Sequence, residues 1–294
     1  TDFRYIARRL APLVRPLHIE DLRFVDDAGQ DYIYKGATNF LLFQRFLEGE
    51  DIEPLLYPAA EVYRTTLVMK YIPNLIGFRD LRPENYPHYW TGLDDFAEYL
   101  LVRGKRFEAT LWCDIQMMGQ DRRWLQRHLD ETNEILNIRA NAFGELVNEY
   151  PKNGVNPLDF ERPHGATLWS RGSGLVDAPP ARPGWDFFGW HGRRDWPKVT
   201  SSAEDMYYVI HAIEDGWDSS RYPPMVGIHD EPIGFAEQHV SGKRSTDPRL
   251  AKQIAITSVL LGRGGTLHTE DGVFSRPLGP IQETCRHAFF EGLT

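Results

Sequence analysis

Short apolar runs separated by longer segments recur along the whole chain. Eight of these runs have the length of a β-strand, and most are rich in β-branched or aromatic residues. Each ends in polar, aromatic or charged residues, which indicates that the strands point towards one functional edge. The runs cover residues 34–43, 66–73, 107–116, 142–150, 166–171, 186–193, 225–232 and 265–270.

Several of the intervening segments carry the signals of amphipathic helices. Ser201 and Glu204 form a capping-box pattern before a helical stretch that ends at Gly216. Asp247 and Pro248 open a second helix, which runs on to a glycine pair. Residues 124–137 and 279–293 have the same helical pattern, whereas the Pro-rich stretch 177–184 predicts a loop in place of the fifth helix.

Repeated alternation of strand and helix predicts an α/β protein with a parallel sheet, and eight repeats predict a single (β/α)8 TIM barrel. The structural alternative is an open doubly wound sheet, which normally has a glycine-rich phosphate loop after its first strand; YKGATNF has none. Residues 1–34 contain a β-hairpin pattern around Asp26–Gly29, which we expect to close the bottom of the barrel. No repeat or linker marks a second domain, so 1–294 is expected to be one domain.

Composition narrows the classes of partner. The 294 residues include 33 Lys and Arg against 42 Asp and Glu, a net charge of −9, which argues against nucleic acid as a partner. No apolar run reaches the ~18 residues needed to cross a bilayer, and the first residues lack a signal-peptide cleavage pattern. We therefore expect a soluble protein without membrane insertion, whose location is open and includes extracellular or assembly-associated sites. Two cysteines, Cys113 and Cys285, exclude a disulfide framework and a zinc-finger cluster.

In a barrel of this kind the active site lies at the carboxyl ends of the strands. The strand ends therefore supply the candidate site residues. These are Lys70, Asp114, Gln116, Asn148, Glu149, Trp169, Arg171, Trp190, His191, Arg193, His229, Asp230, Glu231, His268 and Glu270.

Two of these carboxylates have positions that suit glycoside hydrolysis. Glu149 ends the fourth strand, and Glu231 ends the seventh, three strands away around the ring. Glycosidic bond cleavage requires one carboxyl group that protonates the leaving oxygen and a second that attacks the anomeric carbon or activates water. Asp230 and Glu237 compete with Glu231 for the second role, and Glu145 shares a strand face with Glu149 but is interpreted as a buried carboxylate paired with a barrel Lys or Arg.

The pair Asn148-Glu149 at the end of strand four, with a Glu on strand seven, resembles the retaining (β/α)8 glycoside hydrolases of the cellulase, mannanase and β-galactosidase clan. The resemblance implies Glu149 as acid/base, Glu231 as nucleophile and Asn148 as a ligand of the sugar 2-hydroxyl. His191 fits the clan pattern on strand six. Clan members often carry Arg on strand two, His on strand three and Trp on strand eight, where this chain reads Lys70, Gln116 and His268.

Aromatic and polar residues at the other strand ends would bind the sugar. Aromatic rings stack on the apolar faces of pyranoses, so Trp190, Trp169 and Tyr150 are candidate platforms, as is Trp112. Lys70, Asp114, Gln116, His229 and His268 are candidate hydroxyl ligands. A carbohydrate is the expected partner, and the oligomeric state is left open.

Two other functions remain as alternatives. The departures at Lys70, Gln116 and His268 favour a non-catalytic glycan-binding or structural barrel within a larger assembly. His191, His229 and His268 end three adjacent strands, which favours a metal-dependent hydrolase. The chain lacks a His-x-His on strand one, so we rank hydrogen bonding by these histidines above metal ligation and expect no cofactor and no metal.

Overall fold

The computed structural model describes residues 14–69, 77, 79–113, 120–149, 153–172, 185–191, 226–234, 247–260, 264–269, 271–272, 275 and 277–294. Within these ranges, only the backbone is described for residues 190–191 and 226–234.

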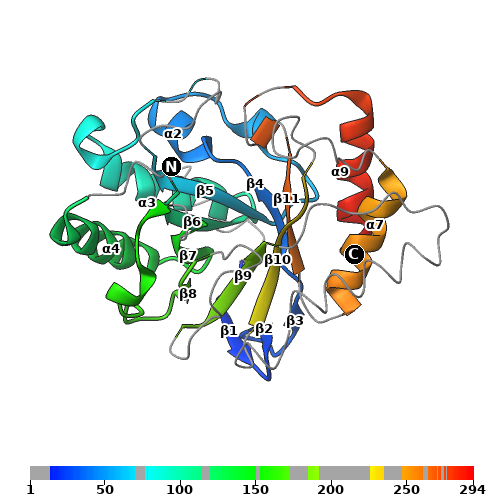
Figure 1. Ribbon diagram of the computed structural model, residues 1–294, viewed down its shortest axis with the longest axis horizontal. Helices are drawn as coiled ribbons and strands as arrows, with labels where there is room; N and C mark the ends of the chain where they lie inside the picture. Colours follow the sequence, from blue (N-terminus) through cyan, green and yellow to red (C-terminus); the bar gives the residue numbers. More distant parts are fainter. Residues whose placement is uncertain are drawn as a thin grey trace, which may run out of the picture.

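Parallel strands form the centre of the molecule (Figure 1). Their hydrogen bonds run in the order β10-β11-β4-β5-β6-β7-β8-β9, and the pairing of β9 with β10 closes this order into a barrel. The predicted α/β class with a parallel sheet is confirmed. The barrel strands are β4 (Lys35–Thr38), β5 (Val62–Val68), β6 (Arg106–Trp112), β7 (Ala142–Val147), β8 (Leu168–Ser170), β9 (Phe187–His191), β10 (Val226–Gly234) and β11 (Gly264–His268).

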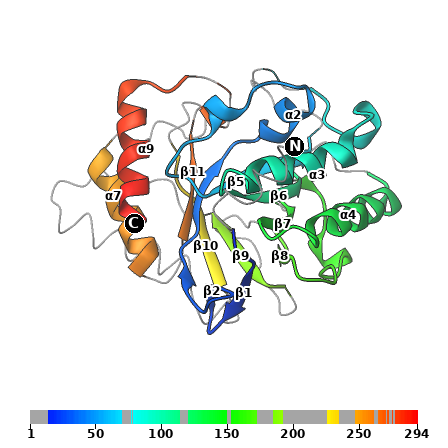
Figure 2. The same ribbon diagram turned by 180° about the vertical axis from the view of Figure 1, so that it is seen from behind.

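Helices lie outside the strands, with α2, α3 and α4 on one side and α7 and α9 packed together on the other, as both views show (Figures 1 and 2). The described helices are α2 (Leu42–Leu47), α3 (Tyr89–Leu101), α4 (Arg122–Leu136), α7 (Pro248–Leu260) and α9 (Pro280–Gly292), with short 3-10 turns at Glu53–Leu55, Pro83–Asn85 and Pro157–Asp159. Three of them match expected helices. The helix expected at 201–216 and the loop expected at 177–184 lie outside the described residues.

Local sequence explains where these helices begin. The Asp121 side chain accepts a hydrogen bond from the Arg123 amide at 3.1 Å, which caps an amide that has no partner within α4. At α7, Asp247 accepts from the Arg249 amide at 2.9 Å, directly before Pro248, whose missing N–H costs nothing in the first turn.

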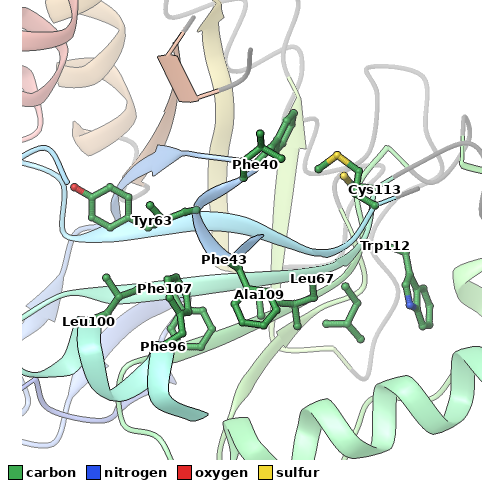
Figure 3. Packing of buried hydrophobic residues seen from close by; sticks show 14 of the residues in the cluster. Phe40, Phe43, Tyr63, Leu67, Phe96, Leu100, Phe107, Ala109, Trp112 and Cys113 are labelled. Carbon is green, nitrogen blue, oxygen red and sulfur yellow. The ribbon is translucent and has the colours of Figure 1, made fainter. Parts of the chain in front are cut away.

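The core lies between the barrel and the helices. Alternate residues of β5 and β6 project outwards onto α2 and α3, so that the ring of Phe107 lies 5.4 Å from that of Phe96 (Figure 3). Phe43 of α2 joins the same group, 5.6 Å from Phe96. Burying each such side chain contributes about 1.5–3 kcal/mol, which fixes the helices against the strands that carry the site.

A small antiparallel sheet precedes the barrel and lies against one end of it (Figure 1). It consists of β1 (Leu17–Glu20), β2 (Arg23–Asp26) and β3 (Asp31–Tyr32). The turn between β2 and β3 falls where the hairpin was expected, because the Asp26 carboxylate accepts from the amides of Ala28 and Gln30, both at 2.9 Å. Phe24 of β2 packs edge-on against Phe143 and Phe187, each with ring centroids 5.7 Å away.

The second barrel strand corrects one sequence prediction. Residues 66–73 were expected as this strand, but β5 covers Val62–Val68. All seven residues of β5 are buried, including Arg64. A charged residue inside the barrel interrupts the apolar pattern, and for that reason the sequence places the strand too late.

Across the described part of the chain, α-helices are too short or too polar to cross a lipid bilayer.

Candidate active site

Strand β7 carries residues of alternating direction, and this alternation builds the interior of the barrel. Phe143 packs near the N-terminal sheet, against Phe24 and Tyr34. Two residues further along the strand, Glu145 meets Arg64. Gly144, between them, faces the opposite side, towards Trp169. Period-two alternation therefore sends Glu145 into the barrel and leaves Gly144 under the helix layer.

A buried ion pair spans the interior between β5 and β7. Arg64 Nε and Nη2 both donate to Glu145 Oε2, at 3.0 and 2.7 Å, and each side chain is only 1% exposed. Thr110 of β6 donates to the same oxygen at 2.6 Å. These contacts confirm the interpretation of Glu145 as a carboxylate paired with a barrel Arg. One level deeper, the Tyr34 hydroxyl donates to the buried Glu108 carboxylate.

Arg64 also reaches the carboxyl end of β7. Its Nη2 donates to Asn148 Oδ1 at 2.7 Å, and Asn148 is 7% exposed. The Asn148 amide donates to the Trp112 carbonyl at 2.9 Å, which continues the pairing of β6 with β7 past the last strand residue. Asn148 is therefore held by its side chain and by its backbone at the end of the fourth barrel strand.

Glu149 follows directly and has an unusual backbone. Its φ of 44° lies in the left-handed region, which a residue with a Cβ adopts at a cost of about 1–3 kcal/mol. Such strain persists only where surrounding contacts hold it, and it clusters at functional sites. The carboxyl-bearing residue that the sequence singles out is thus also strained, and it is partly exposed.

Glu231 lies on β10, the seventh barrel strand, and β7 is the fourth. The two strands are separated by β8 and β9 along the ring, as expected. The pairing of β10 with β11 shifts register between Asp230 and Gly234, so Glu231 stands in an irregular part of the strand. Its side chain, like that of its neighbour Asp230, is not among those described.

Four further predicted site residues are placed by the pairing of their strands. On strands β9 and β10 the backbone register pairs His229 with Trp190 and Asp230 with His191, which brings these residues to one level of the ring. Six others lie outside the described residues: Lys70, Asp114, Gln116, Tyr150, Arg193 and Glu270.

The prediction for Trp169 is wrong. Its neighbours Leu168 and Ser170 pair with Phe143 and Glu145, so they share the interior face, and Trp169 takes the outer one. The indole is fully buried there and donates from Nε1 to Asn133 of α4 at 3.0 Å. Trp169 therefore packs between barrel and helix and offers no face to a sugar.

Two further aromatic positions are also defined. Trp112 is fully buried, with its ring 5.1 Å from Phe160 and 6.4 Å from His128 of α4, which excludes it as an exposed platform. His268 ends β11 as expected; it is 1% exposed and lies edge-on to Phe40 at 5.6 Å. Its role as a substrate ligand stays a prediction.

Arg64 is the residue that the sequence reasoning missed. Its signal was present, since the stretch VYRTTLV alternates around it and ends at the expected edge. No group of three or more His, Cys, Asp or Glu side chains suited to a metal occurs among the residues whose side chains are described.

Neither a protein-family model nor a curated protein sequence matches this chain. Solved structures do match its fold. A glycoside hydrolase of family 5 from Bacteroides vulgatus aligns with a TM-score of 0.60 at 12% identity, covering 94% of this chain and 70% of that one. Another Bacteroides vulgatus structure aligns with a TM-score of 0.62 at 13% identity, and this chain spans only 60% of its length.

Two further matches are nearly equal in length to this chain. A β-glucanase from Saccharophagus degradans aligns with a TM-score of 0.59 at 14% identity, covering 95% of this chain and 94% of that one. A β-mannanase from Streptomyces thermolilacinus, in a structure with mannohexaose, aligns with a TM-score of 0.54 at 13% identity over 94% of each chain. At these identities the likeness establishes the fold, which is that of barrel glycoside hydrolases.

Proposed function

We propose that this protein is a retaining glycoside hydrolase that cleaves O-glycosidic bonds in a poly- or oligosaccharide. The observation that carries the proposal is the Asn148-Glu149 pair, held at the end of the fourth barrel strand by the buried Arg64, with Glu231 on the seventh. The shared fold of solved glycoside hydrolases supports it.

In the proposed reaction Glu149 acts first as a general acid. It protonates the glycosidic oxygen while the Glu231 carboxylate attacks the anomeric carbon, so that the bond to the leaving sugar breaks and a glycosyl ester forms. Glu149, now a carboxylate, takes a proton from water, and that water displaces Glu231. Two inversions give net retention, which requires carboxyl groups about 5–5.5 Å apart.

Asn148 would bind the sugar hydroxyl next to the reacting carbon. Arg64 donates to its Oδ1, which fixes the orientation of the amide, and its nitrogen would donate to a hydroxyl oxygen of the sugar. Trp190 and Tyr150 would stack on sugar rings, and Lys70, Asp114, Gln116, His191, His229 and His268 would bind hydroxyl groups. The reaction as proposed needs no metal and no cofactor.

The same proposal extends to the architecture. We take residues 1–294 as one (β/α)8 domain, in which the hairpin within residues 1–34 closes the bottom of the barrel. The contacts of Phe24 with Phe143 and Phe187 support this role for the hairpin.

The experiment is a turnover assay on β-linked glucans and mannans, the classes named for the β-glucanase and the β-mannanase. Glu149→Gln and Glu231→Gln should each lower kcat at least ~10³-fold, since each removes a group that acts on the reacting bond. Glu134→Gln is the matched control, because Glu134 is exposed on α4, away from the strand ends. Binding without turnover by the unaltered protein would contradict the proposal and indicate a glycan-binding barrel.

A further inference from the structure

Asn153 lies at the carboxyl end of β7. This side chain is 2% exposed, and its Nδ2 donates to the backbone carbonyl of Asn148. The backbone amide of the same residue donates to the carbonyl of Glu149 at 3.4 Å. One residue thus contacts two consecutive carbonyl groups.

Those two carbonyls belong to the peptide units on either side of the Glu149 Cα. The orientation of these two planes defines φ and ψ of Glu149, and φ and ψ define where its Cβ points. Glu149 has a φ of 44°, and it lacks the short polar side chain with which Asn or Asp stabilises this conformation locally. The conformation must therefore be held by contacts from outside the residue, and Asn153 supplies two of them.

A second contact fixes the preceding residue from the other side. Arg64 Nη2 donates to Asn148 Oδ1 at 2.7 Å from within the barrel, while Asn153 binds the Asn148 backbone from the loop. Asn148 is therefore fixed at both its side chain and its carbonyl. Of the two contacting residues, Asn153 is the one that opposes rotation of the peptide unit between Asn148 and Glu149.

We propose that Asn153 is a positioning residue that sets the direction of the Glu149 carboxyl for proton transfer. The proposal rests on the proposed function, and it adds a residue that does not itself touch the substrate. Without the Asn153 contacts, Glu149 relaxes towards negative φ, and its carboxyl group leaves the line to the glycosidic oxygen.

This role predicts a selective kinetic defect. A substrate with a poor leaving group, such as an unactivated oligosaccharide, needs protonation of the leaving oxygen as the bond breaks. A dinitrophenyl glycoside carries a leaving group that departs as a stable anion without a proton. Misplacing the general acid therefore slows formation of the glycosyl ester far more with the first substrate than with the second.

The test variant is Asn153→Asp, which keeps the size of the side chain but replaces the Nδ2 donor by a carboxylate oxygen. We expect kcat/KM on the oligosaccharide, which reports formation of the glycosyl ester, to fall at least about tenfold relative to kcat/KM on the dinitrophenyl glycoside. If the Asp variant does not fold, Asn153→Ala replaces it in the test. This variant removes the Nδ2 donor without adding a charge, and we expect the same ratio. Asn156→Ala is the control, since Asn156 is exposed in the same loop and caps the Leu158 amide at 3.1 Å.

An equal loss of kcat/KM on both substrates, or no loss in a folded Asn153 variant, would overturn the role of Asn153. Thermal unfolding of each variant separates a folding defect from a kinetic one. Failure of the unaltered protein to turn over either substrate would contradict the proposed function instead, so the two failures are distinguishable.

Discussion

Arg64 and Asn148 are joined by a 2.7 Å hydrogen bond that links the interior of the barrel to the end of its fourth strand. The same guanidinium is paired with Glu145 inside the barrel. A residue beside the proposed general acid is thus oriented by an ion pair that lies almost wholly out of contact with solvent.

This arrangement predicts a strong coupling between Arg64 and Glu145. Arg64→Met or Glu145→Met alone should cost about 3–5 kcal/mol in the free energy of unfolding, because each leaves the other charge buried without this partner. The double variant should cost clearly less than the sum. Denaturant unfolding of the four proteins measures the coupling.

Glu291→Gln is the control: it breaks the exposed pair of Glu291 with Lys252 and should change the free energy of unfolding by less than about 1 kcal/mol. Additive losses at Arg64 and Glu145 would refute the coupling.

The backbone of Glu149 predicts that the site is strained. Glycine adopts a positive φ without a Cβ clash, so Glu149→Gly should raise the free energy of unfolding by about 1 kcal/mol relative to Glu149→Ala while abolishing activity. Chemical denaturation of both variants provides the measurement. A Gly variant no more stable than the Ala variant would show that the left-handed backbone stores no strain.

The close packing of Gly144 against Trp169 predicts that a larger residue at position 144 destabilises the protein, and that a smaller residue at position 169 removes most of this effect. A Cβ added at Gly144 would lie far inside van der Waals contact with the Trp169 ring. Gly144→Ala should therefore destabilise the protein by roughly 1–3 kcal/mol. In a Trp169→Leu background the same substitution should cost much less, since the clashing ring is gone. Equal costs in both backgrounds would mean that the clash is not with Trp169.

His128 of α4 predicts a loss of stability in acid. Burial lowers the pKa of His128 to about 3, and its ring stacks on Trp124 with centroids 5.3 Å apart. The Tyr89 hydroxyl donates to the Leu67 carbonyl, so it accepts from His128 Nε2 at 3.1 Å, and the imidazole is neutral. In the unfolded chain the pKa is about 6.5, so the unfolded state takes up a proton below that pH and the folded state does not.

The stabilisation by neutral His128 is complete above pH ~6.5 and is lost towards pH 3, at up to about 1.4 kcal/mol per pH unit. His128→Gln should flatten the dependence of unfolding free energy on pH between 4 and 6. His164→Gln, at an exposed position, should leave that slope unchanged. An unaltered slope in the His128 variant would contradict the buried neutral state.

Hydrophobic runs predict the order and approximate position of the parallel strands, with the second placed too late, because such strands are short, apolar and separated by longer segments. Position along the chain also assigns Asn148 to strand four and Glu231 to strand seven. A hydrophobic run does not predict which face of the strand each side chain occupies. In ATLWSR either set of alternating residues could face the barrel interior. The pairing with β7 shows that Leu168 and Ser170 point inwards and Trp169 outwards.

The burial of charged residues is the other feature that the sequence does not predict. Arg64 lies in the barrel because Glu145, 81 residues later, neutralises it. Neither residue alone indicates burial, so the strand around Arg64 was placed too late in the chain. The positive φ of Glu149 likewise occurs beside contacts from Asn153, and the residue types in this stretch do not predict either feature.

In the proposed reaction Glu231 attacks the anomeric carbon while Glu149 supplies the proton. A 2-deoxy-2-fluoro glycoside with an activated leaving group slows hydrolysis of the glycosyl ester, so the intermediate accumulates and can be located by peptide mass spectrometry. The mechanism predicts one added fluoroglycosyl mass on Glu231, and no label in Glu231→Gln. Label on another residue, or turnover of natural substrate with inverted anomeric configuration and no label at all, would contradict it.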